Sequence, residues 1–286
     1  MTAKSYHLLQ TPLGQPGSAR LRYGAALTLY QAGQVSAEVL EVYRSCASID
    51  GQDPLALLAE YGLQSPAAAM AISHLLARID DYLALRSGPG IADVRHGITS
   101  ALNTKIIPRI PMQNPVIGHH LDAALDAASG QIPELVAAIH AASPYLKWIT
   151  YDGYDPKEIG ADFAQGHAYS CIIGQDAPIA AQGFDLGLFL IAPHVLYRDH
   201  YHPAPELYAP LTGPHGWRFG PNAPFTIKPA HQPIWNEPYA PHLTKVGPVP
   251  FLCIFGWTQD VDGLAKVIPS DDWPALEAMR LKGDDA

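Results

Sequence analysis

The sequence predicts an α+β protein, with an all-helical N-terminal region followed by a small antiparallel β-barrel or jelly roll. Apolar residues recur at helical spacing from Tyr23 to about Ala142. From Pro144 onwards the pattern changes to short β-rich runs separated by Gly and Pro, which is typical of β-sandwiches and barrels. We therefore expect a helical region over residues 1–150 and a β-rich region over residues 151–286.

Capping residues and prolines mark the expected helix starts. Asp53-Pro54 and Ser65-Pro66 each place a proline in a first helical turn, and Ser36 precedes another helical pattern. Ser87-Gly88-Pro89-Gly90 ends the longest helix. The remaining expectations are an irregular arm over 1–23, helices over 66–85, 121–128 and 133–142, and an extended linker over 108–115.

The β-rich region is expected to hold six strands and one short helix. The helix carries Asp271 and Asp272 at its start. The expected strands are 168–173, 184–192, 206–212, 217–219, 225–228 and 250–257, and the helix is 270–280.

Charge and composition exclude several classes of partner. The chain has 286 residues, a net charge of −9 and no basic cluster, so neither nucleic acid nor an anionic membrane surface is an expected partner. The helices are rich in Ala, Leu, Asp and Glu, unlike a DNA recognition helix. Three scattered cysteines do not form a disulfide framework. With neither a signal-peptide pattern over residues 1–10 nor a long apolar run, we expect a cytoplasmic protein.

One stretch carries most of the chemistry. Residues 199–208 read DHYHPAPELY, in which His200, His202, Glu206 and Tyr208 all have even numbers. Side chains alternate along a strand, so these four would project from one face, while Leu207 and Ala209 would pack on the other. Two imidazoles and a carboxylate on one face predict a site for a divalent metal ion.

The same stretch contains two prolines. Pro203 and Pro205 cannot donate to a strand ladder, so we expect a bend or a sheet edge there. Such a bend would bring Glu206 back towards the two histidines.

A further ligand is expected from a distant strand. His242 is the first choice, because it follows a proline turn and precedes the apolar run Phe251–Phe255. His231 is the competing choice, and the residues alone do not exclude it. His215 lies in a Gly-Pro-His-Gly turn, where we expect it to face solvent.

The spacing H-x-H-x3-E-x6-G, followed by a proline-rich turn with a histidine, resembles the two-motif signature of the cupin superfamily. This resemblance implies a small β-barrel with one metal ion bound by His200, His202, Glu206 and His242. The second motif departs from the usual pattern, because Pro-x-Gly is missing before the histidine. The choice between His231 and His242 therefore stays open.

A narrower resemblance covers residues 154–261. Tyr208 two residues after Glu206, together with Tyr197 and Phe255-Gly256-Trp257, is similar to the cupin-type dimethylsulfoniopropionate (DMSP) lyases. Trp235 and Pro241-His242 also resemble the C-terminal half of that group. The resemblance implies a carbon–sulfur lyase that cleaves DMSP, a small zwitterionic sulfonium compound, into dimethyl sulfide and acrylate.

The expected roles follow from that chemistry. A metal ion stabilises charge on the substrate carboxylate, and Tyr208 is placed to remove the α-proton. Tyr208 could instead be a fifth ligand or a packing residue, and Tyr197 is a second acid, base or hydrogen-bond donor. Aromatic faces attract a sulfonium cation, so Trp235, Tyr239 and Trp257 are the candidate substrate contacts.

The sequence leaves several alternative functions open. An iron-dependent dioxygenase or an isomerase with the same metal ligands would have the same sequence motif, and a non-catalytic binding cupin is a third possibility. The ligand types suit Zn, Fe(II), Mn, Co or Ni. The helical region would cap the β-rich region or form a dimer interface, since a homodimer is the commonest oligomer.

Overall fold

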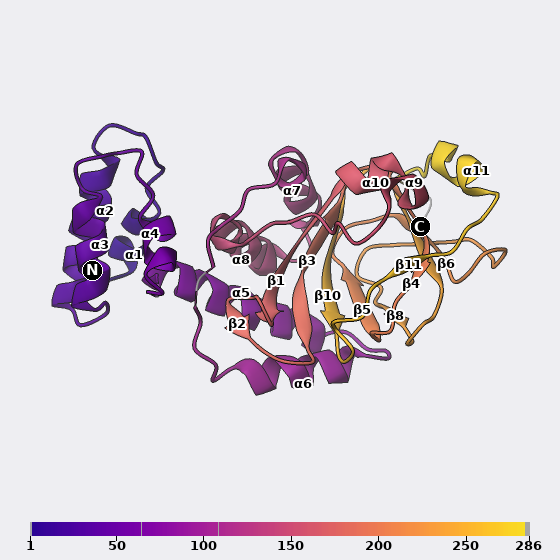
Figure 1. Cartoon of the computed structure of the whole chain (residues 1–286), viewed down its shortest axis with the longest axis horizontal. Helices are drawn as coiled ribbons and strands as arrows, with labels where there is room; N and C mark the ends of the chain where they lie inside the picture. The colour runs from indigo at the N-terminus through magenta and orange to yellow at the C-terminus, as the bar shows by residue number, and fades with distance from the viewer. Residues whose placement is uncertain (1, 64, 108, 284–286) are drawn as a thin grey trace.

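The computed structural model describes residues 2–63, 65–107 and 109–283, with the first helices at one end of the longest axis and the strands in the middle and towards the other end (Figure 1). Four helices gather at the N-terminal end: α1 (Thr2–Leu9), α2 (Ser18–Gln31), α3 (Ala37–Ser45) and α4 (Pro54–Glu60). The next four lie beside the first sheet: α5 (Pro66–Ala84), α6 (Ile91–Ala101), α7 (Pro115–Ala128) and α8 (Pro133–Ala142). The 3-10 turn η1 (Ser143–Tyr145), α9 (Pro156–Ile159) and α10 (Ala161–Gln165) lead into the strands.

The predicted capping signals begin real helices. Ser65 accepts a hydrogen bond from the Ala68 amide at the start of α5, and α8 has the predicted bounds. Helix α7 begins six residues earlier than predicted, because Asn114 caps it and Pro115 fills its first turn. Helix α6, which directly follows Gly90, was missed.

The prediction of an irregular arm over residues 1–23 is wrong. That segment contains α1 and the start of α2. Asp50 accepts hydrogen bonds from the amides of Gly17 and Ala19, and buried Arg22 donates to the carbonyls of Thr11, Pro12 and Asp50. The contacts of Asp50 join residues 28 to 33 positions apart, so local sequence did not reveal them.

The β-rich region forms two sheets. One has six strands in the order β2-β1-β3-β10-β5-β8, and the other has five in the order β11-β4-β9-β6-β7. Every pair within them is antiparallel except β1 with β2. The strands of the first sheet are β1 (His167–Gly174), β2 (Ile179–Ala180), β3 (Asp185–Ile191), β5 (Glu206–Pro210), β8 (Ile234–Asn236) and β10 (Phe251–Trp257). Those of the second are β4 (Leu196–Tyr201), β6 (His215–Arg218), β7 (Thr226–Lys228), β9 (His242–Val246) and β11 (Lys266–Val267).

The six-stranded sheet has a different neighbour on each face. Leu207, Ala209 and Ile254 join one continuous apolar core with the helices, so the helical region caps this sheet as predicted. Helix α6 lies so close that a Cβ on Gly256 of β10 would stand 2.7 Å from the Val94 side chain. The other face, with Tyr208, belongs to a second core between the two sheets.

The C-terminal helix α11 (Trp273–Ala278) lies within the predicted 270–280 segment and is fixed to the five-stranded sheet. Arg218 of β6 pairs with both Asp199 of β4 and Asp272, and the Trp273 indole donates to Asp199 at 2.8 Å. Asp199 and Arg218 are both buried.

The helices followed by antiparallel sheets confirm the predicted α+β fold class, while the division into two domains at residue 150 stays a prediction. A search of the described helices finds no candidate membrane span.

Candidate functional site

The central motif spans both sheets. His200 lies on β4 of the five-stranded sheet, whereas Glu206 and Tyr208 lie on β5 of the six-stranded sheet. The bend expected at Pro203 and Pro205 is therefore a complete crossing from one sheet to the other. All four even-numbered side chains still turn into the space between the sheets, because β5 resumes with the same parity.

Three histidines converge in that space. The nitrogens of His200, His202 and His242 that face one another lie within 4.8 Å, and all three residues are buried. His200 and His242 are register partners on β4 and β9, with ring centroids 4.0 Å apart. This places three nitrogen ligands around one point.

The outer nitrogen of each ring is fixed by the backbone. Each Nδ1 donates to a carbonyl two residues away in the chain: Arg198 for His200, Ala204 for His202 and Ala240 for His242. A carbonyl only accepts, so each Nδ1 carries a hydrogen. The neutral rings of His200 and His242 therefore present their Nε2 lone pairs inwards, whereas Nε2 of His202 donates to the Glu206 carboxylate at 3.0 Å. The Nε2 atoms of His200 and His242 have no hydrogen-bond partner among the described residues.

Glu206 completes the cluster. Its Oε2 lies 3.0 Å from Nε2 of His202 and 3.6 Å from Nε2 of His242. Burial opposes its charge, but His202, His242 and a hydrogen bond from Trp257 together lower the pKa of this carboxyl group. Glu206 is therefore an anion at neutral pH.

These four side chains fit a divalent cation. Burial lowers the pKa of His200 well below its usual value and that of His242 to about 4, so both are neutral lone-pair donors at pH 7. Burial also acts on His202, but the adjacent Glu206 carboxylate outweighs it and raises the pKa of this ring. The Nε2 atoms of His200 and His242, together with that of His202, supply three nitrogens, and the buried Glu206 carboxylate supplies one oxygen. This donor set suits a four-ligand metal site.

The other two candidate ligands lie elsewhere. Nδ1 of His231 is 3.1 Å from the Tyr82 hydroxyl of α5, outside the cluster. The prediction that His215 faces solvent is wrong, because this residue begins strand β6 and is completely buried. Its Nδ1 accepts from the Trp217 indole at 2.6 Å, and burial lowers the pKa of His215 to about 4.

A small aromatic cavity of about 80 Å³ adjoins the cluster. Tyr208 and Tyr197 line it beside Glu206. The Tyr208 ring centroid lies 6.4 Å from that of His242, while Tyr197 stacks on His200 at 3.8 Å. Burial, and then the Glu206 charge, raise the pKa of Tyr208 well above its usual value. Burial likewise raises that of Tyr197.

Several cavity residues were missed by the sequence analysis. The Tyr154 hydroxyl lies 2.8 Å from that of Tyr197. Tyr151, Tyr169 and Phe189 also line the cavity. Tyr169 and Phe189 are register partners on β1 and β3, so their strand positions were a usable signal. Tyr151 and Tyr154 lie outside the strands and reach the cavity only through the tertiary fold.

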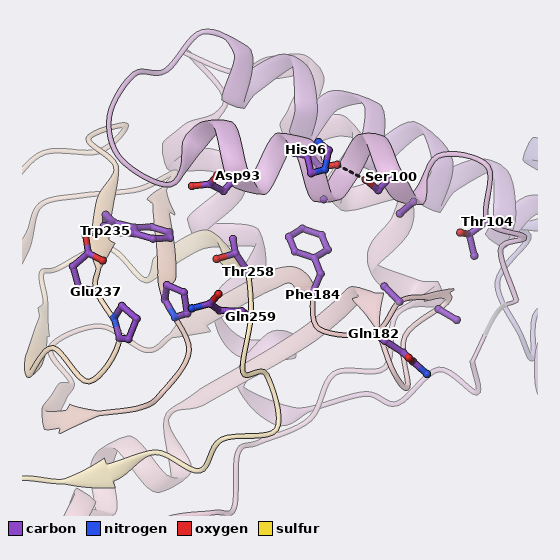
Figure 2. Close-up of a pocket in the computed structure, with 16 residues that line it drawn as sticks. Asp93, His96, Ser100, Thr104, Gln182, Phe184, Trp235, Glu237, Thr258 and Gln259 are labelled. Atoms are coloured by element: carbon purple, nitrogen blue, oxygen red, sulfur yellow. Dashed lines mark hydrogen bonds between the residues drawn. The ribbon is translucent and has the colours of Figure 1, made fainter.

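The structure places the three predicted substrate-contact residues in three different surroundings. Trp257 lines the cavity, but its indole N–H donates to Glu206 Oε1 at 2.7 Å. Trp235 is the register partner of Leu207, so it belongs to the outer face of the sheet. There it donates to Glu237 at one end of a groove of about 720 Å³ beneath α6, where Figure 2 shows both residues. Tyr239 is 61% exposed. The structure therefore brings only Trp257 to the cavity.

The sheets and the buried cluster define the class: a cupin-type β-barrel with a candidate metal site inside. The family model of dimethylsulfoniopropionate lyases matches residues 95–253, more than half of the chain. The chain belongs to this family.

Relatives of known sequence agree with this assignment. Dimethylsulfoniopropionate lyase DddQ of Ruegeria pomeroyi is 28% identical over 126 residues, which cover 44% of this chain and 61% of DddQ. Putative dimethylsulfoniopropionate lyase DddL of Cereibacter sphaeroides is 29% identical over 162 residues, which cover 54% of this chain and 64% of DddL. The chain thus spans less than two thirds of the length of each relative.

Solved structures show the same fold. One from a study of the DMSP lyases RdDddP and RnDddQII has a TM-score of 0.57 at 21% identity, over 71% of this chain and all of that chain. DMSP lyase DddQ from Ruegeria pomeroyi DSS-3 has a TM-score of 0.51 at 21% identity, over 69% of this chain and 96% of that chain.

Proposed function

We propose that this protein is a metal-dependent lyase that cleaves dimethylsulfoniopropionate to dimethyl sulfide and acrylate. One observation carries the proposal beyond family membership. Tyr208 lies in the same cavity as Glu206, with its ring centroid 6.4 Å from that of His242, so the proposed base and the proposed cation site would share one small space.

The reaction needs a base beside a stabilised carboxylate. The α-proton of DMSP is weakly acidic because the carbanion it leaves is adjacent to a carboxylate. His200, His202, Glu206 and His242 would hold a divalent ion, which supplies Lewis-acid stabilisation of the substrate carboxylate.

Tyr208 is the proposed base. Its phenolate oxygen would take the α-proton, the C–H electron pair would form the C=C bond, and the C–S bond would break. Dimethyl sulfide then leaves with the C–S pair, and acrylate remains. Burial and Glu206 raise the pKa of Tyr208, so a positive charge bound nearby would favour its ionisation.

Tyr197 has a supporting role in this proposal. Its hydroxyl is paired with that of Tyr154 at 2.8 Å in the cavity wall, so it is available as a hydrogen-bond donor or proton carrier. The aromatic walls suit the sulfonium group, which has methyl groups and no N–H or O–H. Phe255 of β10 and Phe189 of β3 are among these wall residues.

Headspace gas chromatography tests this function. Chelated protein and protein reloaded with Zn²⁺, Mn²⁺ or Fe²⁺ would be incubated with DMSP, and dimethyl sulfide and acrylate quantified together. We expect equimolar products that disappear on chelation and return on reloading. Oxygen consumption with the iron form, without dimethyl sulfide, would instead indicate a dioxygenase with the same ligands. No product from any fully loaded form would contradict the proposal.

A further inference from the structure

Two side chains, the half-buried Trp257 and the buried Asn236, hold the Glu206 carboxylate from opposite sides. The Trp257 indole donates to Oε1 at 2.7 Å, and the Asn236 amide donates to Oε2 at 3.3 Å. Glu206 and Asn236 are 2% and 1% exposed. The two donors come from β10 and β8, the two strands that flank β5.

The register makes this arrangement a property of the sheet. Glu206 is the direct register partner of both Asn236 and Trp257, so all three side chains project from the same face. The neighbouring residues Trp235 and Leu207 point to the opposite face. A carboxylate with neutral donors on both oxygens is limited in its rotation.

The orientation of Asn236 supports a role towards Glu206. Its Oδ1 is buried and has no hydrogen-bond partner in the described part of the chain. Turning the amide over would place this oxygen against the carboxylate, which is repulsive. In the observed orientation, the Asn236 N–H group faces Glu206 and the buried Oδ1 has no partner within the described ranges. An unpaired buried acceptor costs free energy, so this orientation indicates that the contact with the carboxylate is the important one.

We infer that Trp257 and Asn236 are positioning residues that orient Glu206 as a metal ligand. This rests on the metal site of the proposed function. Trp257 was expected to face the sulfonium group, but its only polar hydrogen is given to Glu206 and its ring stacks on His202, with centroids 4.6 Å apart. Its contact with the metal-binding cluster is thus twofold.

The test is the Zn²⁺ dissociation constant, measured by competition with a chromophoric chelator on the full chain. Trp257→Phe keeps a ring on His202 and removes the N–H, and Asn236→Leu removes the amide. Each should weaken Zn²⁺ binding about 10- to 100-fold, the usual range for outer partners of metal ligands. In a Glu206→Gln background, neither substitution should have a further effect.

Trp235→Phe is the matched control. It also removes an indole N–H that is donated to a glutamate, but Glu237 lies in the α6 groove (Figure 2). We expect Zn²⁺ affinity to be unchanged. Thermal unfolding of the metal-free proteins identifies a variant that fails to fold, in which case the other variant decides.

The outcomes separate this inference from the proposed lyase activity, because metal affinity is measured without substrate. Wild-type Zn²⁺ affinity in folded Trp257→Phe and Asn236→Leu would overturn it, even if the protein cleaves DMSP. An increased KM for DMSP in Trp257→Phe, with Zn²⁺ affinity unchanged, would also overturn it and return Trp257 to a substrate contact. Weaker binding that persists in the Glu206→Gln background would show that Glu206 is not the residue served.

Discussion

The helical region and the β-barrel bury different kinds of side chain. In the described helices, the buried polar residues such as Arg22 and Ser65 are bonded to the backbone and hold helix ends or loops. In the barrel, the buried nitrogens of His200, His202 and His242 face one another, and the buried Glu206 carboxylate lies beside His202 and His242. Burying polar groups is costly without partners, so a cluster of inward-facing polar atoms points to a ligand. We therefore predict that the helices contribute stability and the barrel contributes chemistry.

The largest effect should follow removal of a histidine from the barrel cluster. His242→Ala deletes one of three converging nitrogens, so Zn²⁺ affinity should fall by more than about 100-fold, beyond the loss expected for an outer partner. Metal content after dialysis, measured by inductively coupled plasma mass spectrometry, checks this. His231→Ala is the control and should keep the wild-type metal content. The reverse result would assign the distant ligand to His231.

Breaking the buried ion pair between Asp199 of β4 and Arg218 of β6 should mainly reduce stability. Arg218→Met leaves Asp199, which is completely buried, without its cationic partner. Removing one member of a buried pair costs about 3–5 kcal/mol of unfolding free energy. Urea denaturation of the metal-free protein measures this loss. As a surface comparison, Glu41→Gln breaks an exposed pair with Arg44 and should leave the urea midpoint nearly unchanged.

A cavity in the helical core tests whether the two regions are separable in function. Leu75 of α5 is completely buried, so Leu75→Ala should reduce the unfolding free energy by about 2–5 kcal/mol. Zn²⁺ affinity of the folded variant should not change. A lower affinity would show that the helices also shape the metal site.

A smaller, pH-dependent effect is expected at the start of β3. Burial, and then repulsion from Asp262, raise the pKa of Asp185 to about 6, against about 4 in an unfolded chain. The folded state therefore holds this proton more tightly, and the resulting stabilisation is present below pH 4 and lost as the pH rises through 6. Asp185→Asn should be more stable than the wild type above pH 6, and equal to it near pH 4. Solvent screening of this partly exposed group limits the gain to about 1 kcal/mol or less. Thermal melts at pH 4 and 7.5 measure it.

The sequence predicted features that depend on local pattern. The parity of His200, Glu206 and Tyr208 indicated side chains that face a common space, although the structure places them on two different sheets. Proline marked the helix starts at 66 and 133. The positions it missed depend on contacts that are distant in sequence. Tyr154 reaches Tyr197 across 43 residues, and His215 is buried because β6 lies between β7 and β9.

Trp235 shows the limit of a motif-based prediction. Its neighbour Asn236 points towards Glu206, while Trp235 itself points to the groove on the outer face. A shift of one position along a strand changes the face, and the register with β5 was needed to decide which face Trp235 occupies.

Oligomeric state and cellular location stay predictions.

The most direct test of this account is the rate of dimethyl sulfide release by metal-loaded Tyr208→Phe. The substitution removes only the hydroxyl of a residue that lines the cavity beside Glu206. We predict wild-type Zn²⁺ affinity with kcat lowered about 10²- to 10⁴-fold, the range for loss of a general base. Full turnover by this variant with its metal bound would contradict the assignment of Tyr208 as the base.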